Sequence, residues 1–212
     1  MLGVGDKPLA QRVKLRAPLY FVRHGQTDWN AERRMQGLSD IPLNDVGRGQ
    51  ARRNGEALAD ALGDAADQAR FFTSPLSRAR ETCEILRATV GLPLQRYSLD
   101  DRLVEIDMGD WNGKTRDEIE RDAPGEWEAR GAHLRYAQAP NGERPEDVAA
   151  RTAAFLADWA EATRSPLVVV GHGASGRFLR AILRGLGERR LVRLEARQDR
   201  VYRLVGRRET AL

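Results

Sequence analysis

Two histidines of this sequence stand directly after short apolar segments, and a glycine follows each of them. His24 lies in "LYFVRHG" and His172 in "PLVVVGHG". Apolar runs of this length are typical of buried strands, and ligands of open α/β sheets bind at the carboxyl ends of the strands. Glycine lets the backbone approach a ligand closely. If the two strands are neighbours, the two imidazoles meet at one edge of the sheet.

Two arginines extend this pair of histidines. Arg23 precedes the first histidine, and Arg78 lies in the first turn of a helix expected after the strand-like segment 70–74. Arg80 is two residues further along that helix, so it points to another face. The helix expected after His172 adds free N–H groups that attract an anion. Guanidinium and imidazole groups around a helix N-terminus indicate a site for a dianionic phosphoryl group.

Each of these residues also has a structural interpretation when it is taken alone. A single histidine at a strand end is more often a structural residue than a catalyst, and a single arginine in a helix is more often a surface residue. The functional interpretation of His24, Arg78 and His172 depends on their joint position at three strand ends. His133, in "ARGAHLRYAQ", has no such position and is expected to be structural.

Strands that alternate with helices are expected to bring the site together. Five segments are expected to form or contain strands: 19–22, 70–74, 94–98, 166–174 and 200–206. Helices are expected at 44–63, 75–89 and 175–187. This alternation predicts an α/β domain with a largely parallel sheet.

Local signals define the expected helix ends. Asn44 is a suitable N-cap for the first helix, in which Val46, Ala51, Leu58 and Leu62 are expected near one face. Pro75 is expected in the first turn of the second helix, and glycines are expected to end the third.

Composition indicates a globular protein of one domain. The 212 residues are 41% hydrophobic and 31% charged, and no apolar run approaches the roughly 18 residues that a membrane span needs. Residues 1–17 lack the apolar core of a signal peptide and are expected to form a loose leader before a single domain at 18–212. Cys83 is the only cysteine, which excludes an intrachain disulfide and favours a cytoplasmic location.

The charge distribution favours a small anionic ligand. The formal net charge is +4, and only three of the 35 basic residues are lysines. Arginine suits bidentate binding of phosphate. Acidic residues interrupt the most basic stretch, "RRLVRLEARQDR", so it is no clean nucleic-acid-binding tract. The expected partner is a small phosphorylated metabolite, with neither nucleic acid nor membrane involved.

The segments that carry these residues resemble the histidine phosphatase superfamily, the phosphoglycerate-mutase-like family. "RHGQTDWN" at 23–30 resembles the family's signature, and "TSPLSRARET" resembles its Ser-Pro-Leu-x-Arg-Ala segment. "LVEIDMGDWNG", "PNGERPEDVAAR" and "VVVGHGA" follow in the family's order. The resemblance implies a three-layer α/β/α sandwich with a mostly parallel central sheet, and no cofactor or metal.

The resemblance also implies a role for individual residues. The implied catalytic residues are His24, Glu105, Arg23, Arg78 and His172. The implied phosphate- or substrate-binding residues are Arg23, Asn30, Gln36, Gly37, Arg78, His172 and Gly173. In this scheme His24 attacks phosphorus to form a phosphohistidine, and the other cationic groups hold the phosphoryl oxygens. Glu105 acts as general acid, although the residues alone leave the acid open among Glu105, Asp100, Asp101, Asp107 and Asp110.

Three departures from the family pattern leave the substrate open. Asn112, Asn141 and Arg144 replace residues that are commoner in the family at these places. Lys114 and Arg116 are either contacts for an acidic substrate or exposed helix residues. The stretch between Glu105 and His172 contains no clear match to the basic insertion of cofactor-dependent mutases. A metal-independent phosphatase is therefore expected; the alternatives are a mutase and a non-catalytic phospho-ligand-binding module.

Overall fold

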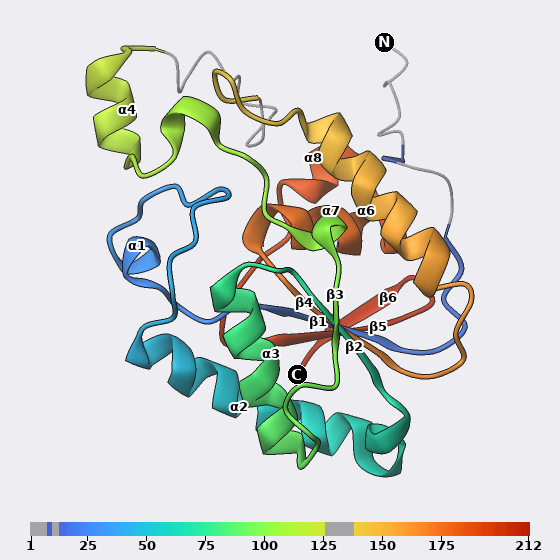
Figure 1. The fold of residues 1–212 in the computed structure, drawn as a ribbon. Helices are drawn as coiled ribbons and strands as arrows, with labels where there is room; N and C mark the ends of the chain where they lie inside the picture. Colours follow the sequence, from blue (N-terminus) through green and yellow to red (C-terminus); the bar gives the residue numbers. More distant parts are fainter. Residues whose placement is uncertain (1–7, 10–12, 126–137) are drawn as a thin grey trace.

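A six-stranded sheet forms the centre of the computed structural model, with the strand order β3-β2-β4-β1-β5-β6 (Figure 1). The structure describes residues 8–9, 13–125 and 138–212. Four neighbouring strands are parallel: β1 (Leu19–Arg23), β2 (Arg70–Thr73), β3 (Ser98–Leu99) and β4 (Leu167–Gly171). β5 (Val201–Val205) is antiparallel to β1, and β6 (Arg208–Ala211) is antiparallel to β5. The expected mostly parallel α/β sheet is confirmed.

Helices cover both faces of this sheet. The α-helices are α1 (Asp28–Ala31), α2 (Asp45–Leu62), α3 (Ser77–Val90), α4 (Arg116–Asp122), α6 (Pro145–Trp159), α7 (Gly173–Arg184) and α8 (Glu188–Leu191). The described residues also form the short 3₁₀ helices η1 (Gly63–Gln68), η2 (Asp101–Leu103) and η3 (Gly109–Trp111). In Figure 1, α2 and α3 lie below the sheet, and α6 and α7 lie above it.

Alternation along the strands explains the three layers. Tyr20 and Val22 of β1 pack in the cluster formed by α2 and α3, whereas Leu19 and Phe21 pack in the cluster formed by α6 and α7. Successive strand side chains point to opposite faces, so a strand that is apolar throughout is buried on both sides. The predicted three-layer α/β/α sandwich is confirmed.

Two of the expected strands differ in extent from the structure. Only Ser98 of the segment 94–98 is in a strand, because Arg87 Nε donates to the Pro93 carbonyl at 2.7 Å and stabilises a turn there. The segment 200–206 contains β5, as expected, but β5 is not the last strand. Gly206 adopts a positive φ of 59°, which allows the chain to turn directly into β6.

One helix face and two helix starts also differ from the expectations. Val46 is 55% exposed, because it lies about 140° around α2 from Ala51. Pro75 precedes α3 rather than lying in its first turn, with Leu76 as the N-cap. α7 begins at Gly173, two residues earlier than expected, with His172 as its N-cap. Asn44 does cap α2, since its side chain accepts the Gly47 N–H at 2.9 Å.

The described part of the segment before β1 packs against the domain. Pro8 forms a bridge with Gly187, and Leu9, Val13 and Leu15 pack against the α6–α7 side of the core. The division into a leader and one domain stays a prediction. No helix in the described ranges is long and apolar enough to cross a membrane.

Candidate active site

The two histidines meet at the carboxyl end of the central parallel strands. β1 pairs with β4 so that Arg23 lies opposite Gly171, which places the next residue of each strand, His24 and His172, side by side. Their ring centroids are 5.1 Å apart, and both residues are almost fully buried. The expected juxtaposition of the two imidazoles is therefore confirmed.

The contacts of His24 define which ring nitrogen is available. Nδ1 lies 2.7 Å from the Gly25 carbonyl oxygen. Since a carbonyl only accepts, Nδ1 carries the proton and Nε2 keeps its lone pair. Burial and the neighbouring guanidinium groups of Arg23 and Arg78 lower the pKa of His24 well below its usual value. The imidazole is therefore neutral, with a free Nε2 electron pair.

His172 is anchored through one ring nitrogen only. Its Nε2 lies 2.8 Å from Ser74 Oγ, at the end of β2. Its Nδ1 is buried and has no hydrogen-bond partner among the described residues. Burial, followed by the charges of His24 and Arg78, lowers the pKa of His172 well below its usual value. One nitrogen of a neutral, fixed ring is therefore left for a ligand.

Arg78 is a fully buried cation whose guanidinium is only partly satisfied. Its two Nη atoms donate to the carbonyls of Ser39 at 2.6 Å and Gly37 at 3.0 Å. Its Nε is buried without a hydrogen-bond partner in the described chain. Burial lowers its pKa to about 10, so it stays protonated at neutral pH. A buried cation with an unused donor favours an anionic ligand.

Glu105 occupies the N-terminus of α7. Its carboxylate accepts the N–H groups of Ala174 and Ser175 at 3.0 to 3.1 Å, and Ile106 donates to it at 3.0 Å. The expectation that the first N–H groups of this helix are free for a ligand is wrong for Ala174 and Ser175, because the protein's own carboxylate accepts them; binding by Gly173 stays a prediction. A β-carbon at Gly173 would lie 3.4 Å from both Glu105 Oε2 and the Arg23 guanidinium carbon. Glycine therefore lets the acid and Arg23 approach the same turn of the helix.

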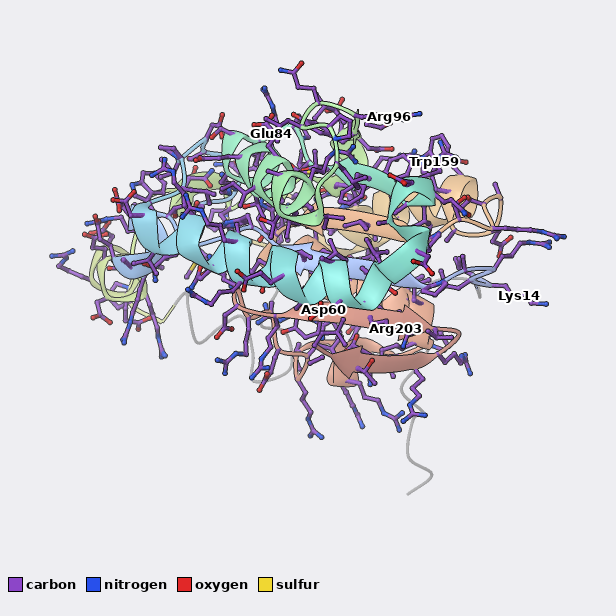
Figure 2. The ribbon with its side chains drawn as sticks, turned by 90° about the horizontal axis from the view of Figure 1, so that it is seen from below. Lys14, Asp60, Glu84, Arg96, Trp159 and Arg203 are labelled. Carbon is purple, nitrogen blue, oxygen red and sulfur yellow. The ribbon has the colours of Figure 1, made fainter. Side chains whose placement is uncertain are left out.

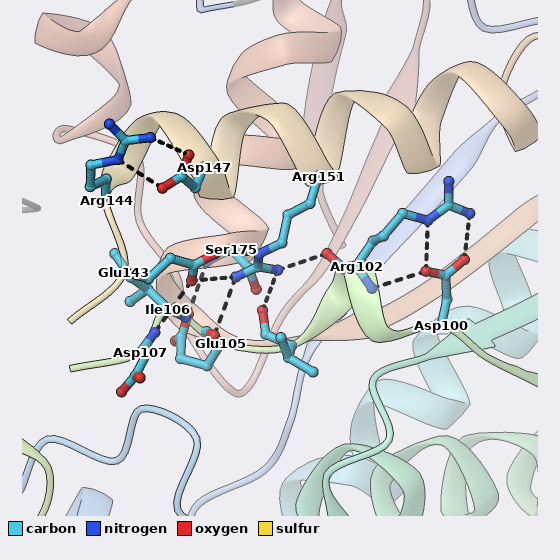
Figure 3. A network of polar contacts seen from close by, with 11 residues as sticks. Asp100, Arg102, Glu105, Ile106, Asp107, Glu143, Arg144, Asp147, Arg151 and Ser175 are labelled. Carbon is cyan, nitrogen blue, oxygen red and sulfur yellow. Dashed lines mark hydrogen bonds and ion pairs between the residues drawn. The ribbon is translucent and has the colours of Figure 1, made fainter. Parts of the chain in front are cut away.

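An arginine that the sequence analysis did not single out holds the Glu105 segment (Figure 3). Arg151 of α6 donates to the carbonyls of Arg102, Val104 and Glu105 at 2.7 to 3.2 Å. It also forms a two-bond ion pair with Glu143, at 2.8 and 3.0 Å. The backbone on both sides of the acid is therefore fixed by one side chain.

The four aspartates near Glu105 do not share its contacts. Asp100 pairs with Arg102 at 2.7 Å, and Asp110 accepts from Asn141 at 3.0 Å. Asp107 Oδ1 accepts from the Gly109 N–H at 2.9 Å and from Asn112 at 3.1 Å, inside its own loop. Asp101 is exposed in η2. Of the five candidate acids, Glu105 is the one whose carboxylate accepts N–H groups at the start of α7.

Two of the implied phosphate-binding residues, Asn30 and Gly37, have structural contacts in this structure, whereas Gln36 differs from them. The Asn30 carboxamide oxygen accepts from the Thr27 N–H at 3.2 Å and from Gln198 at 2.8 Å. Gly37 has a positive φ of 48° and supplies a carbonyl to Arg78. Gln36 is buried, and its Oε1 has no hydrogen-bond partner among described residues. Their binding of phosphate stays a prediction.

Lys114, His133 and a possible metal site are the remaining features to place in the structure. Lys114 Nζ pairs with Asp122 at 3.0 Å, and His133 lies outside the described residues. Within the described ranges, no group of three or more His, Cys, Asp or Glu residues is placed to hold a metal ion.

Known proteins with similar sequences or structures include phosphatases and a probable phosphoglycerate mutase. The glucosyl-3-phosphoglycerate phosphatase of Mycolicibacterium vanbaalenii is 38% identical over 176 residues, which cover 79% of this chain and 74% of that protein. A protein named "Probable phosphoglycerate mutase GpmB" from Salmonella paratyphi C is 35% identical and covers 82% of this chain and 79% of its own length. The solved structure of a mycobacterial glucosyl-3-phosphoglycerate phosphatase with VO3 has a TM-score of 0.73 at 32% identity, covering 92% of this chain and 97% of that one. Residues 19–211 match the histidine phosphatase superfamily (branch 1), and the chain therefore belongs to this superfamily.

Proposed function

We propose that this protein hydrolyses a small phosphate monoester through a phosphohistidine intermediate on His24. One observation carries the proposal: a buried, neutral imidazole keeps a free Nε2 lone pair beside His172 and near the guanidinium groups of Arg23 and Arg78. A nucleophile surrounded by cationic and hydrogen-bonding groups suits a phosphoryl group, because charge stabilisation and positioning supply most of phosphoryl-transfer catalysis.

In the first step, His24 Nε2 attacks phosphorus in line and forms the P–N bond while the P–O bond to the leaving group breaks. Arg23, Arg78 and His172 hold the three equatorial oxygens. The buried Arg78 Nε and His172 Nδ1 are the atoms left for these oxygens. Glu105 gives its proton to the departing alkoxide.

In the second step, water attacks phosphorus and the P–N bond breaks. Glu105 takes a proton from this water, and the His24 lone pair is restored. Inorganic phosphate leaves, and the acid is protonated for the next cycle. The cycle requires no redox step and no metal.

The substrate is proposed to be a small phosphorylated metabolite of the sugar-acid type. This rests on the relatives named glucosyl-3-phosphoglycerate phosphatase, at 38% and 39% identity. The GpmB relative, at 35% identity, keeps a mutase as the second candidate. The two differ in the acceptor of the phosphoryl group, which is water in one and a hydroxyl of the substrate in the other.

The test is release of inorganic phosphate from a panel of phosphate monoesters, with a chelator present. We expect release by the wild type and by Arg80→Gln, and loss of release in His24→Ala and Arg78→Gln. Arg80 is the matched control, because it is an exposed arginine two residues along the same helix. Interconversion of phosphoglycerates without phosphate release would favour the mutase. Neither activity, with binding of inorganic phosphate retained, would favour the non-catalytic module.

A further inference from the structure

A second cationic pocket lies at the opposite end of β2 from the site. Its walls are the end of η1, the first residues of β2, the turn after α3 and the start of β3, and its volume is about 490 Å³. Ser74, which contacts His172, follows the other end of β2. The pocket therefore shares no lining residue with the candidate active site.

The charge of this pocket is unbalanced. Arg70, Arg87 and Arg96 line it, and Asp67 is its one acidic lining residue. Gln68, Gln95, Tyr97 and Ser98 add polar groups. Figure 2 shows Arg96 projecting from the surface on the α3 side of the molecule. Three arginines and several hydrogen-bonding side chains form a suitable lining for an oxyanion.

Arg87 is the residue that most requires a ligand. It is 3% exposed, its guanidinium lies 4.6 Å from the centre of the Phe71 ring, and its Nε donates to the Pro93 carbonyl at 2.7 Å. In the described part of the chain no carboxylate forms an ion pair with Arg87, and the bond from Nε to Pro93 is the one hydrogen bond of its side chain. Burial of a cation without a counter-charge is costly.

We propose that this pocket binds a small polyanion, whose phosphate or carboxylate groups are held by Arg87, Arg96 and Arg70. The aromatic ring under Arg87 and the turn carbonyl at Pro93 fix the guanidinium plane, which leaves its outer edge for a planar or tetrahedral oxyanion. Arg70 is exposed, and its guanidinium lies 4.7 Å from the centre of the Trp159 ring. The ligand needs at least two anionic groups to contact more than one of these arginines.

The probes are citrate and inorganic phosphate, added at millimolar concentration to the full chain while backbone amide NMR shifts are followed. We expect shifts at Tyr97 and Ser98 in the wild type and in Arg52→Gln, an exposed-arginine control on α2. Arg96→Gln should weaken this binding about tenfold, the usual value of a charge-assisted hydrogen bond, and leave phosphate-ester turnover unchanged. Arg96 is exposed, so its replacement does not disturb the core.

Tighter binding of citrate than of phosphate would identify a polycarboxylate as the preferred ligand. Tighter binding of phosphate would identify a phosphate compound. Arg87→Gln is the second variant and should abolish the shifts at Ser98. Shifts restricted to the residues around His24, or equal shifts at Ser98 in the wild type and Arg96→Gln, would overturn the proposal.

Discussion

The contacts of single side chains explain why His24 is suited to attack phosphorus. Gly25 fixes the proton on Nδ1, and burial with two neighbouring cations keeps the ring neutral. A hydrogen bond between His172 Nε2 and the Ser74 hydroxyl fixes the orientation of the second imidazole. These contacts use one backbone carbonyl and one hydroxyl of the protein, so the ring positions are set before any ligand enters.

Glu105 and Asp107 can be separated by one pair of conservative variants. Glu105→Gln should lower turnover of an alkyl phosphate by about 10²- to 10⁴-fold, the usual contribution of a general acid. The loss should be smaller for a nitrophenyl phosphate, whose leaving group needs no proton. Asp107→Asn should mainly lower the free energy of unfolding, since Asp107 bonds within its own loop. A greater loss of turnover in Asp107→Asn would contradict the assignment of the acid.

Arg151 is expected to act through Glu105. Arg151→Met removes the donors that hold the carbonyls at 102, 104 and 105, so the acid is displaced and turnover falls. Because residues that act as a unit are non-additive, the same change in a Glu105→Gln background should cost little more. Steady-state turnover of the two single variants and the double variant measures this. Losses that multiply would show that Arg151 supports activity by another route.

The sequence could predict the site residues that follow a recognisable strand or stand where the family resemblance implies a role. His24, Arg78 and His172 each follow a recognisable strand, so their meeting point follows from parallel pairing. Arg151 and Glu143 lie in the segment "PNGERPEDVAAR", but only tertiary packing brings Arg151 to the Glu105 carbonyl and pairs Glu143 with Arg151. No local signal separates Arg151 from the many arginines that lie on the surface. The sequence also did not show that a carboxylate of the protein accepts N–H groups at the start of α7. This carboxylate belongs to Glu105, which lies 70 residues before Ser175 in the sequence.

At the scale of elements, close packing of helices against the site loops sets the geometry. Gly47 in the first turn of α2 faces the backbone of Gln26, and a β-carbon there would lie 2.1 Å from the Gln26 carbonyl oxygen. The residues that follow His24 are therefore held against α2 with no room for a side chain.

Two glycines of α2 test this packing. Gly47→Ala should destabilise the protein by about 1–3 kcal/mol, the usual cost of overpacking. Gly49→Ala, two residues on, meets only the end of Arg53 at 3.5 Å and should stabilise it by about 0.5–1 kcal/mol, because alanine loses less entropy in a helix. Urea unfolding of the two variants measures both values. Equal effects would show that the close approach of Gln26 is unimportant.

Element prediction was accurate where one local signal dominated. The apolar runs before Arg23 and His172 became β1 and β4, and Asn44 became the N-cap of α2. β6 was missed because "RETA" is polar and forms an exposed edge strand, so burial gives it no pattern. The prediction that Val46 lies on the buried face of α2 was wrong. That face includes Gly47, Asn54 and Gly55, which a pattern of apolar residues does not reveal.

At the scale of the whole molecule, the buried histidines connect stability with pH. The pKa values of His24 and His172 are below the ordinary value of 6.5 in the folded protein. Below about pH 6.5 the unfolded chain therefore binds protons that the folded protein does not. Their contribution to stability is present above this pH and is lost as the pH falls, by about 1.4 kcal/mol per pH unit for each group.

Urea unfolding at several pH values between about 7 and 5 measures this slope. We expect the free energy of unfolding of His172→Gln to fall less steeply with decreasing pH than that of the wild type. A variant with the wild-type slope would show that His172 is not held neutral in the folded protein.

The central claim concerns the bond between His24 and phosphorus, and trapping that bond tests it most directly. The protein is mixed with a phosphate monoester, quenched in alkali, which preserves phosphohistidine, and digested for mass spectrometry. The account predicts one phosphoryl group on the peptide that contains His24, absent in His24→Ala and accumulating in Glu105→Gln with an activated ester, because hydrolysis then lacks its base. Substrate turnover with no label on His24, or an equal label in His24→Ala, would contradict it.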